Sequence, residues 1–515
     1  MKRALPAVAA MAVATALAIA GCTSGSSSSA ASTGAVPAGS ASAVSWHSCT
    51  EQGASMLCGS LQVPLDYSHP NGRKIALALS EVPATAPAAK RQGVLLVNPG
   101  GPGGAGLSLA AFVAEGLDPS VAADYTIVGF DTRGVGASVP SLSCDSSFFS
   151  HARPDYIPAS AAEEQQNVDR AKTYAADCEK KYGWLLPYMT TENIARDMNS
   201  IRMALGQKQI SYFGYSYGTY IGQVFATLFP HQLRRMVLDS TVDPTGVWWQ
   251  DNIEQDYAFQ GRLEAFFAWM AKYDSVYNLG TTAAEVSASW YKARDLLEAH
   301  PIPVNGTPLI GPDEFDDTML IGGYDNSYWP GLAAALSSYL NDHSTSQLVS
   351  QYDQEGIQNE NEFAVYNAVE CSDVRWPRNW ATWNTDTKQV YASAPFEAWD
   401  NAWFNASCAF WPVKGSSKPL QIKGAGLPGI LMLQGTLDPA TPYAGAQVAH
   451  SLLPSARMVV VEGGGNHGQS LSDPPNNCVN GYLNRYLATG ALPQHPGKVN
   501  ATCPALPDPT PSSAG

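Results

Sequence analysis

The stretch that decides the fold is "QISYFGYSYGTYIGQVFA", residues 209–226, which surrounds Ser216 with glycines and tyrosines. An apolar, β-branched approach typical of a buried strand meets the run GYSYG at 214–218 and continues with helical character. The run fits G-x-S-x-G, in which the serine occupies a strained strand-to-helix turn and the flanking glycines remove side chains that would clash. We therefore predict that Ser216 is a nucleophile presented at this corner.

The same strand-then-helix pattern recurs along the chain. Near-continuous apolar runs are typical of central strands covered on both faces. A helical pattern over 191–206 begins with Thr190 or Thr191 as its capping residue. Strands that alternate with helices predict a mostly parallel α/β sheet. Further strand-like runs begin at Lys74, Gly93, Tyr125, Arg234, Gly429 and Arg457.

The alternation stops between residues 247 and 420. This region holds eleven of the thirteen tryptophans, and its first part has amphipathic helical patterns. A helical insertion of this size between two sheet strands indicates a cap, or lid, over the sheet. We expect most of its aromatic residues to form the core of the cap itself.

A serine hydroxyl needs a base that removes its proton as it attacks. His467 in "EGGGNHGQS" follows a late strand in a glycine-rich loop, and we predict that it is this base. Asp438 in "LQGTLDPATP" follows the preceding strand and is the favoured carboxylate partner, with Asp239 in "LDST" as the competing acid. The order Ser216, Asp438, His467 is that of α/β-hydrolases. The predicted fold is thus an α/β-hydrolase, a mostly parallel sheet flanked by helices, with the helical cap inserted between strands.

The attacked carbonyl also needs hydrogen-bond donors for its developing oxyanion. We predict that the backbone N–H of Tyr217 is one donor. The glycine-rich loop "VNPGGPGGAG" at 97–106 supplies the other, from Gly101 with Gly100 as the neighbouring candidate. The loop lacks the GxxxxGK[ST] pattern of a nucleotide site. Asp131 and Arg133 in the next loop are expected to form a structural ion pair that braces it.

The N-terminus has the layout of an export signal. A short basic start and an apolar run are followed by "IAGC", which resembles a bacterial lipobox with Cys22 as the lipidated residue. We expect an extracellular protein anchored to the outer face of the membrane through Cys22 alone. The expected division is signal peptide 1–21, disordered tether 22–45, first part of the hydrolase core 46–246, cap 247–420, second part of the core 421–503 and disordered tail 504–515.

Charge and cysteine content agree with an exported globular protein. The net charge of −15 argues against nucleic acid as a partner. Eight cysteines remain besides Cys22, an even number that suggests disulfides in an exported chain. We predict pairs between sequence neighbours, namely Cys49–Cys58, Cys144–Cys178, Cys371–Cys408 and Cys478–Cys503. The sequence contains neither a CxxC pair nor an HExxH motif, so we expect no metal site.

Together the segments "NPGGPGGAG", "DTRGVGAS", "GYSYGTYIG", "GTLDPATP" and "GGGNHG" closely resemble the exported tripeptidyl aminopeptidases of actinomycetes, in the prolyl-aminopeptidase branch of α/β-hydrolases. The resemblance covers nearly the whole chain after the tether. It implies release of short peptides from free N-termini, without metal or organic cofactor. The wider branch usually has His-Gly-Gly-Pro-Gly in the oxyanion loop, whereas this chain has Pro99 in place of the histidine.

Such an enzyme must bind the α-ammonium of its substrate, which calls for carboxylates at a fixed distance from the serine. "AVECSD" at 368–373 resembles the family's segment for this task, with Glu370 as the first candidate and Asp373 as the second. The alternative is that both carboxylates cap a helix or pair with Arg375. Two other functions compete with the peptidase: a secreted carboxylesterase with the same triad, and a non-catalytic binding lipoprotein on an inherited fold.

Overall fold

The protein was analysed as a computed structural model that describes residues 44–511. The predicted signal peptide, Cys22 and most of the predicted tether lie outside these residues. Val44, the first described residue, packs against the main hydrophobic core, so the folded part begins slightly earlier than expected. Within 44–511 no helix combines the length and the apolar character that crossing a membrane requires.

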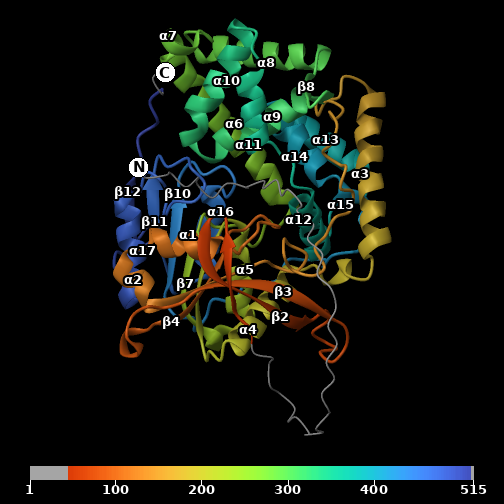
Figure 1. Cartoon of the computed structure of the whole chain (residues 1–515). Coiled ribbons are helices and arrows are strands. Elements are labelled where there is room, and N and C mark those ends of the chain that lie inside the picture. The colour runs from red at the N-terminus through yellow and green to blue at the C-terminus, as the bar shows by residue number, and fades with distance from the viewer. Residues whose placement is uncertain (1–43, 512–515) are drawn as a thin grey trace.

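A ten-stranded sheet in the order β1-β2-β3-β5-β4-β6-β7-β10-β11-β12 forms the centre of the molecule (Figure 1). β1, β2 and β3 are antiparallel and β3 is antiparallel to β5, whereas the neighbours from β5 to β12 run parallel. The mostly parallel sheet and all seven expected strands are confirmed; β1, β2 and β12 were not expected. The strands are β1 (His47–Glu51), β2 (Ala54–Pro64), β3 (Lys74–Val82), β4 (Gly93–Asn98), β5 (Tyr125–Phe130), β6 (Ile210–Tyr215), β7 (Leu233–Asp239), β10 (Ile430–Gly435), β11 (Ala456–Glu462) and β12 (Ala501–Pro504).

Helices cover both faces of this sheet. Alternate residues of a strand point to opposite faces, so Leu95 and Val97 of β4 pack into one core while Val94 and Leu96 pack into the other. α1 (Leu109–Gly116), α2 (Pro119–Asp124) and α17 (Asn477–Thr489) cover the first face. α4 (Thr191–Ala204), α5 (Tyr217–Leu228) and α16 (Tyr443–Leu452) cover the second. The Thr190 side chain accepts the Asn193 N–H and thus caps α4.

A mainly helical region lies between β7 and β10 and stands above the sheet in Figure 1. Its larger part has a hydrophobic core of its own, which contains Trp290 and Trp329. A two-stranded sheet, β8-β9, interrupts the helices. The elements are α6 (Trp249–Lys272), α7 (Asp274–Tyr277), α8 (Ala283–Ala299), β8 (Ile302–Val304), β9 (Thr307–Ile310), α9 (Pro312–Tyr324), α10 (Trp329–Asn341), α11 (Ser346–Glu355), α12 (Glu360–Asp373), α13 (Trp380–Tyr391), α14 (Ala398–Asn405) and α15 (Ser407–Phe410).

Two helices connect this region to the hydrolase core. The apolar side chains of α12, among them Phe363 and Ala368, pack into the main core beneath the cap. α3 (Ala161–Tyr182), which follows β5 in sequence, contacts α14 and α15. α12 therefore lies at the boundary between the cap and the sheet, where a substrate cleft is expected.

Four disulfides join cysteines that are neighbours in sequence, so the predicted pairing is confirmed. They link β1 to β2, the loop after β5 to α3, α12 to α15, and α17 to β12. Disulfides form in oxidising compartments, which supports an extracellular protein. The pairs are Cys49–Cys58, Cys144–Cys178, Cys371–Cys408 and Cys478–Cys503.

The expected ion pair between Asp131 and Arg133 is wrong. Arg133 pairs instead with Asp197 of α4 at 2.7 Å, and both side chains are fully buried. Asp131 accepts the N–H of Gly106 and that of Ala137, each at 2.8 Å. Asp131 thus braces the glycine-rich loop through the backbone, whereas Arg133 ties its own loop to a helix.

The expected disordered tail is also wrong for residues 505–511, which we call the C-terminal strap. The Asn326 amide donates to Asp508 at 2.9 Å, and the Trp269 indole N–H donates to the Pro509 carbonyl at 2.8 Å. The Pro/Ser-rich composition suggested disorder, but fixed φ angles and backbone acceptors suit a segment that docks without regular structure. Residues 512–515 lie outside the described residues.

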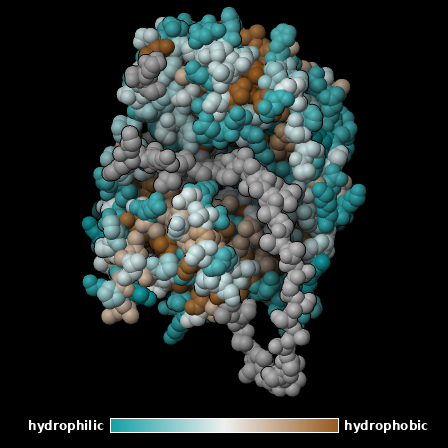
Figure 2. All heavy atoms as spheres, in the orientation of Figure 1, coloured by the Kyte–Doolittle hydropathy of each residue, from teal (hydrophilic) through white to brown (hydrophobic). Residues whose placement is uncertain are grey.

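The exterior is more hydrophilic than the core. Figure 2 shows this face covered largely by hydrophilic residues, with hydrophobic residues in small separate areas. Scattered apolar residues of this kind are normal for a protein surface.

Candidate active site

Ser216 lies at the corner between β6 and α5 with φ 54° and ψ −129°. This left-handed conformation is uncommon for a residue with a side chain and is typical of a strained functional turn. A Cβ on Gly214 would lie 2.5 Å from the Gly218 carbonyl oxygen, and one on Gly218 would lie 2.8 Å from the Asn98 carbonyl oxygen. Both glycines are therefore required for the close packing that presents the Ser216 hydroxyl.

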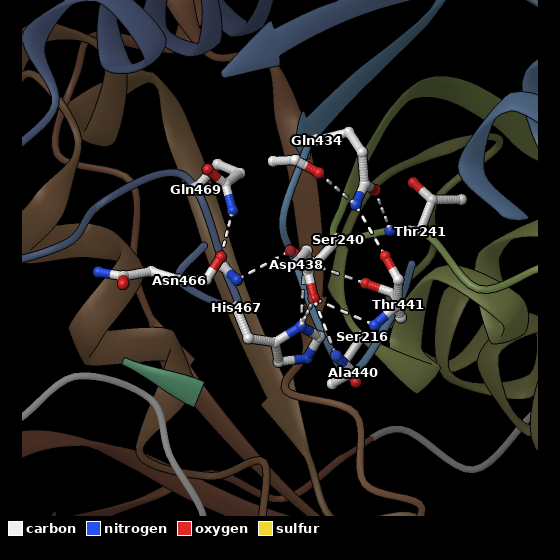
Figure 3. A network of polar contacts seen from close by, with 12 residues as sticks. Ser216, Ser240, Thr241, Gln434, Asp438, Ala440, Thr441, Asn466, His467 and Gln469 are labelled. Atoms are coloured by element: carbon white, nitrogen blue, oxygen red, sulfur yellow. Dashed lines mark hydrogen bonds and ion pairs between the residues drawn. The ribbon is translucent and has the colours of Figure 1, made fainter. Parts of the chain in front are cut away.

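His467 and Asp438 face each other across the ends of β11 and β10 (Figure 3). Nδ1 of His467 lies 2.9 Å from one carboxylate oxygen of Asp438 and 3.2 Å from the other. The Asp438 carboxylate also accepts the backbone N–H groups of Ala440 and Thr441 and the Thr441 hydroxyl. These donors fix the carboxylate, and the carboxylate in turn fixes the orientation of the His467 ring through Nδ1, as in the Asp–His pair of serine hydrolase triads.

Asp239, the competing acid, has a different set of partners. It accepts the backbone N–H groups of Gln469 and Ser470, at 2.8 and 3.0 Å, and the Ser470 hydroxyl. Burial raises its pKa to about 6. Asp239 therefore holds the loop that follows His467, and the imidazole contacts Asp438 instead.

The end of β7 connects the serine to the histidine loop. The Ser216 N–H donates to the Asp239 carbonyl at 3.0 Å, and the Gly468 N–H donates to the Ser240 hydroxyl at 2.8 Å. Among residues 44–511, no hydrogen bond runs from the Ser216 hydroxyl to the His467 ring. In unliganded enzymes this contact commonly tightens only when substrate is bound.

The glycine-rich loop after β4 lies directly against the Ser216 corner. Gly100 and Gly101 have φ of 101° and 105°, and a Cβ on Gly100 would lie 3.0 Å from the Tyr217 nitrogen. The Gly100 N–H already donates to the Asn98 side chain at 3.0 Å. The N–H of Tyr217 begins α5 and has no partner within the helix. The geometry therefore favours Gly101 over Gly100 as the second oxyanion donor beside Tyr217.

Asp373 is committed to a structural contact. Its carboxylate accepts the Thr191 N–H at 2.7 Å and the Thr191 hydroxyl at 2.5 Å, and this hydroxyl lies 2.8 Å from the Tyr217 phenol. Burial raises the pKa of Asp373 to about 7. The suggested partner Arg375 has an exposed side chain and uses its backbone N–H for Ser416. Asp373 thus supports the start of α4 and the ring of Tyr217.

Glu370 accepts hydrogen bonds from neutral side chains only. It is 2% exposed, and its partners are the Tyr366 hydroxyl and the Asn252 amide, the latter 3.4 Å away. Burial raises the pKa of Glu370 well above its usual range. Positions 362, 366 and 370 of α12 are four residues apart and share one helix face. On this face Glu362, which the sequence analysis did not single out, has a pKa raised to about 7 by burial.

Glu362 also marks where α12 meets the glycine-rich loop. A Cβ on Gly103 would lie 2.6 Å from the Glu362 carbonyl oxygen. Burial is the main cause of the raised pKa of Tyr324, and the nearby charges of Glu397 and Asp438 add to it. The Tyr324 ring lies 5.6 Å from the His467 ring, edge to face. Carboxyl groups of the cap, Glu362 and Glu397 among them, therefore lie near the Tyr324 ring beside His467, although their sequence pattern resembles that of any solvated helix face.

Because these carboxyl groups are buried, the free energy of unfolding should fall as the pH rises and they ionise. Their native pKa values exceed the values of the unfolded chain, so the native state retains protons that the unfolded state has released. The free energy of unfolding should consequently decrease between about pH 4 and pH 7. Burial sets the pKa to about 6 for Asp131 and Asp239, and to about 7 for Asp256, Asp316, Glu362 and Asp373.

Asp256→Asn tests this directly by urea unfolding at pH 4 and pH 8. Asp256 is 5% exposed, and the Asn401 amide donates to it at 2.9 Å, a bond that asparagine can still accept. We expect the variant to be more stable than the wild type by about 2–4 kcal/mol at pH 8 and equally stable at pH 4. A wild-type stability that rises from pH 4 to pH 7 would contradict the assignment.

Comparison with known proteins supports the same fold over most of the chain. The family described as "alpha/beta hydrolase fold" matches residues 93–289, and the family described as "TAP-like protein" matches residues 394–503. The tripeptidyl aminopeptidase of Streptomyces lividans is 41% identical over 446 residues, which cover 84% of this chain and 81% of that protein.

Two mycobacterial proteins are similar at a lower level. The serine protease Hip1 of Mycobacterium tuberculosis is 31% identical over 459 residues, covering 85% of this chain and 86% of that protein. A carboxylesterase B of the same species is 31% identical over 471 residues, covering 87% and 88%. The chain belongs to the tripeptidyl aminopeptidase family of serine α/β-hydrolases.

Proposed function

We propose that this protein is an exported serine aminopeptidase that releases tripeptides from the free N-termini of peptides. The observation that carries the proposal is the His467–Asp438 pair beside a serine at a strained strand-to-helix corner, beneath a cap whose buried Glu370 carboxyl joins no ion pair among residues 44–511. The similarity to a tripeptidyl aminopeptidase supports the substrate class.

In the proposed reaction, Ser216 attacks the scissile carbonyl while Nε2 of His467 takes the hydroxyl proton. His467 then protonates the leaving amine, and a water molecule that His467 activates hydrolyses the acyl-enzyme. Asp438 stabilises the imidazolium formed in each step. The N–H groups of Tyr217 and Gly101 bind the oxyanion.

Glu370 binds the substrate ammonium in this proposal, and α12 sets the length of the released peptide. Glu362 lies against the oxyanion loop, and Glu370 lies eight positions further along the same helix. Eight residues rise about 12 Å along a helix, and three extended residues span about 10 Å. A tripeptide bound with its last carbonyl at Ser216 therefore brings its ammonium near Glu370.

A panel of free and N-acetylated mono-, di- and tripeptide anilides tests this function. We expect efficient turnover of the free tripeptide anilide alone, because only its ammonium reaches Glu370. Glu370→Gln should raise KM for this substrate about tenfold or more, since one charge-assisted contact is lost. Equal turnover of the acetylated tripeptide would contradict the proposal.

Asp373→Asn is the matched control for Glu370→Gln. It changes the same type of group on the same helix, but Asp373 already has Thr191 as its partner. Its effect should appear in stability, with the preference for a free N-terminus retained.

A secreted carboxylesterase is the second candidate, because a carboxylesterase B is among the similar proteins. An esterase would turn over short p-nitrophenyl esters far better than any peptide anilide.

We further propose that Cys22 is lipidated and holds the enzyme on the outer face of the membrane. Metabolic labelling with a palmitate analogue should mark the wild type and leave Cys22→Ser unlabelled.

A further inference from the structure

The loop that carries His467 contacts the cap as closely as it contacts the sheet. The His467 N–H donates to the carbonyl of Tyr324, the last residue of α9, at 2.7 Å. Asn466 donates to the Asp325 carboxylate at 3.0 Å and accepts the Asn326 N–H at 3.1 Å. Three consecutive residues of the cap therefore hold two consecutive residues of the catalytic loop.

A buried arginine of the cap contacts the same loop one residue earlier. Arg262 of α6 is 6% exposed, its Nε–H donates to the Gly323 carbonyl at 3.4 Å, and its guanidinium lies 5.1 Å from the centre of the Trp329 ring. Within the described residues its Nη2 has no hydrogen-bond partner and its guanidinium joins no ion pair. A Cβ on Gly465 would lie 2.1 Å from Nη1 of Arg262. The guanidinium thus lies directly against the backbone that leads to His467.

The C-terminal strap also contacts the part of the cap that holds the histidine loop. It leaves the sheet at β12, which the Cys478–Cys503 disulfide joins to α17. Asp508 then accepts the amide of Asn326, and Pro509 accepts the indole N–H of Trp269 in α6. The strap therefore connects the sheet to the corner of the cap that holds the histidine loop.

We propose that Arg262, the corner 324–326 and the strap 505–511 together position His467, so that the cap fixes the catalytic base as well as binding the substrate. This inference rests on the proposed role of His467 as the base. Because the cap contacts hold the N–H of His467 and the two residues before it, displacement of the cap displaces the ring relative to Ser216. The members of this group are positioning residues, since none of them contacts the reacting atoms.

Gly465→Ala gives a clean test because the strain it introduces has one source. Gly465 has no positive φ, and the three atoms nearest to its added Cβ all belong to Arg262. We expect kcat for p-nitrophenyl acetate to fall about tenfold with KM unchanged, because a small misplacement of the base slows the chemical step. Labelling of Ser216 by a fluorophosphonate should slow in parallel.

Arg262→Ala supplies the second half of the test. Alone it should lower kcat, because the support beneath Gly465 is lost. When Gly465→Ala is added to Arg262→Ala, kcat should fall no further, since the clash with the guanidinium is gone. The effects of the two substitutions on kcat should therefore be non-additive. Additive effects on kcat, or a rise in KM with kcat unchanged, would overturn the proposal.

A truncation after Ala505 and the point variant Asn326→Ala test the strap. Both should lower kcat and the labelling rate without changing KM, and Asn326→Ala removes only one exposed amide contact. Asp169→Asn, which alters an exposed carboxylate that accepts the Gln165 amide on α3, is the matched control and should match the wild type. Unchanged kcat in both strap variants would overturn the proposed role of the strap in positioning His467.

These readouts separate the inference from the proposed function. Acetyl ester turnover and fluorophosphonate labelling need the serine and its base but no substrate ammonium. A wild type that is neither active on the ester nor labelled would refute the proposed catalytic machinery, whereas a fully active Gly465→Ala would refute the positioning alone.

Discussion

Ser216→Ala should lower kcat for a free tripeptide anilide by about a millionfold, the scale of loss when the nucleophile of a serine hydrolase is removed. The remaining oxyanion donors and the substrate contacts cannot replace the acyl-enzyme pathway. Because the substitution removes one hydroxyl at a position where the backbone conformation is unchanged, the melting temperature should stay close to that of the wild type. Steady-state kinetics and differential scanning calorimetry measure the two effects.

Ser211→Ala is the matched control for this substitution. Ser211 lies on β6, the strand that leads to Ser216; it is 1% exposed, and its hydroxyl has no hydrogen-bond partner within residues 44–511. Its removal should leave activity intact. Activity retained by Ser216→Ala, or lost equally by Ser211→Ala, would contradict the assignment of the nucleophile.

Asp438→Asn should lower kcat by about ten-thousandfold with little change in KM. An amide at this position can donate to Nδ1 of His467, which would place the ring in the tautomer that cannot accept the serine proton. The backbone donors Ala440 and Thr441 still find an acceptor oxygen, so the loop should remain folded. Kinetics with the tripeptide anilide and circular dichroism test both statements.

Asp239→Asn distinguishes the two acids. Its carboxylate holds the backbone of Gln469 and Ser470, so its loss should affect the loop and lower kcat by at most about a hundredfold. If Asp239→Asn proved the more damaging of the two, Asp239 rather than Asp438 would be the partner of the histidine.

The parts of the fold that local chemistry determines could be predicted from the sequence. Continuous apolar runs such as 93–98 become the central strands because both of their faces are buried. The turn at Ser216 and the histidine loop at the end of β11 could be predicted because each is marked by glycines that a tight turn requires. The disulfides join sequence neighbours and therefore required no knowledge of the tertiary structure.

Contacts between distant segments could not be predicted in the same way. Arg133 lies two residues from Asp131, but its partner Asp197 is on another element. Glu362 and Arg262 have the sequence pattern of ordinary helix faces, and only the packing of the cap shows that Arg262 is buried and Glu362 half-buried. The strap has the composition of a disordered tail, yet partners from two cap segments hold it.

Mass spectrometry of the products from one unblocked decapeptide and its N-acetylated twin tests the central claim most directly. The proposed enzyme should release the first three residues of the unblocked peptide, then the next three, and should leave the acetylated twin intact. Cleavage of the acetylated peptide at a comparable rate, or release of single residues from the unblocked one, would contradict the account.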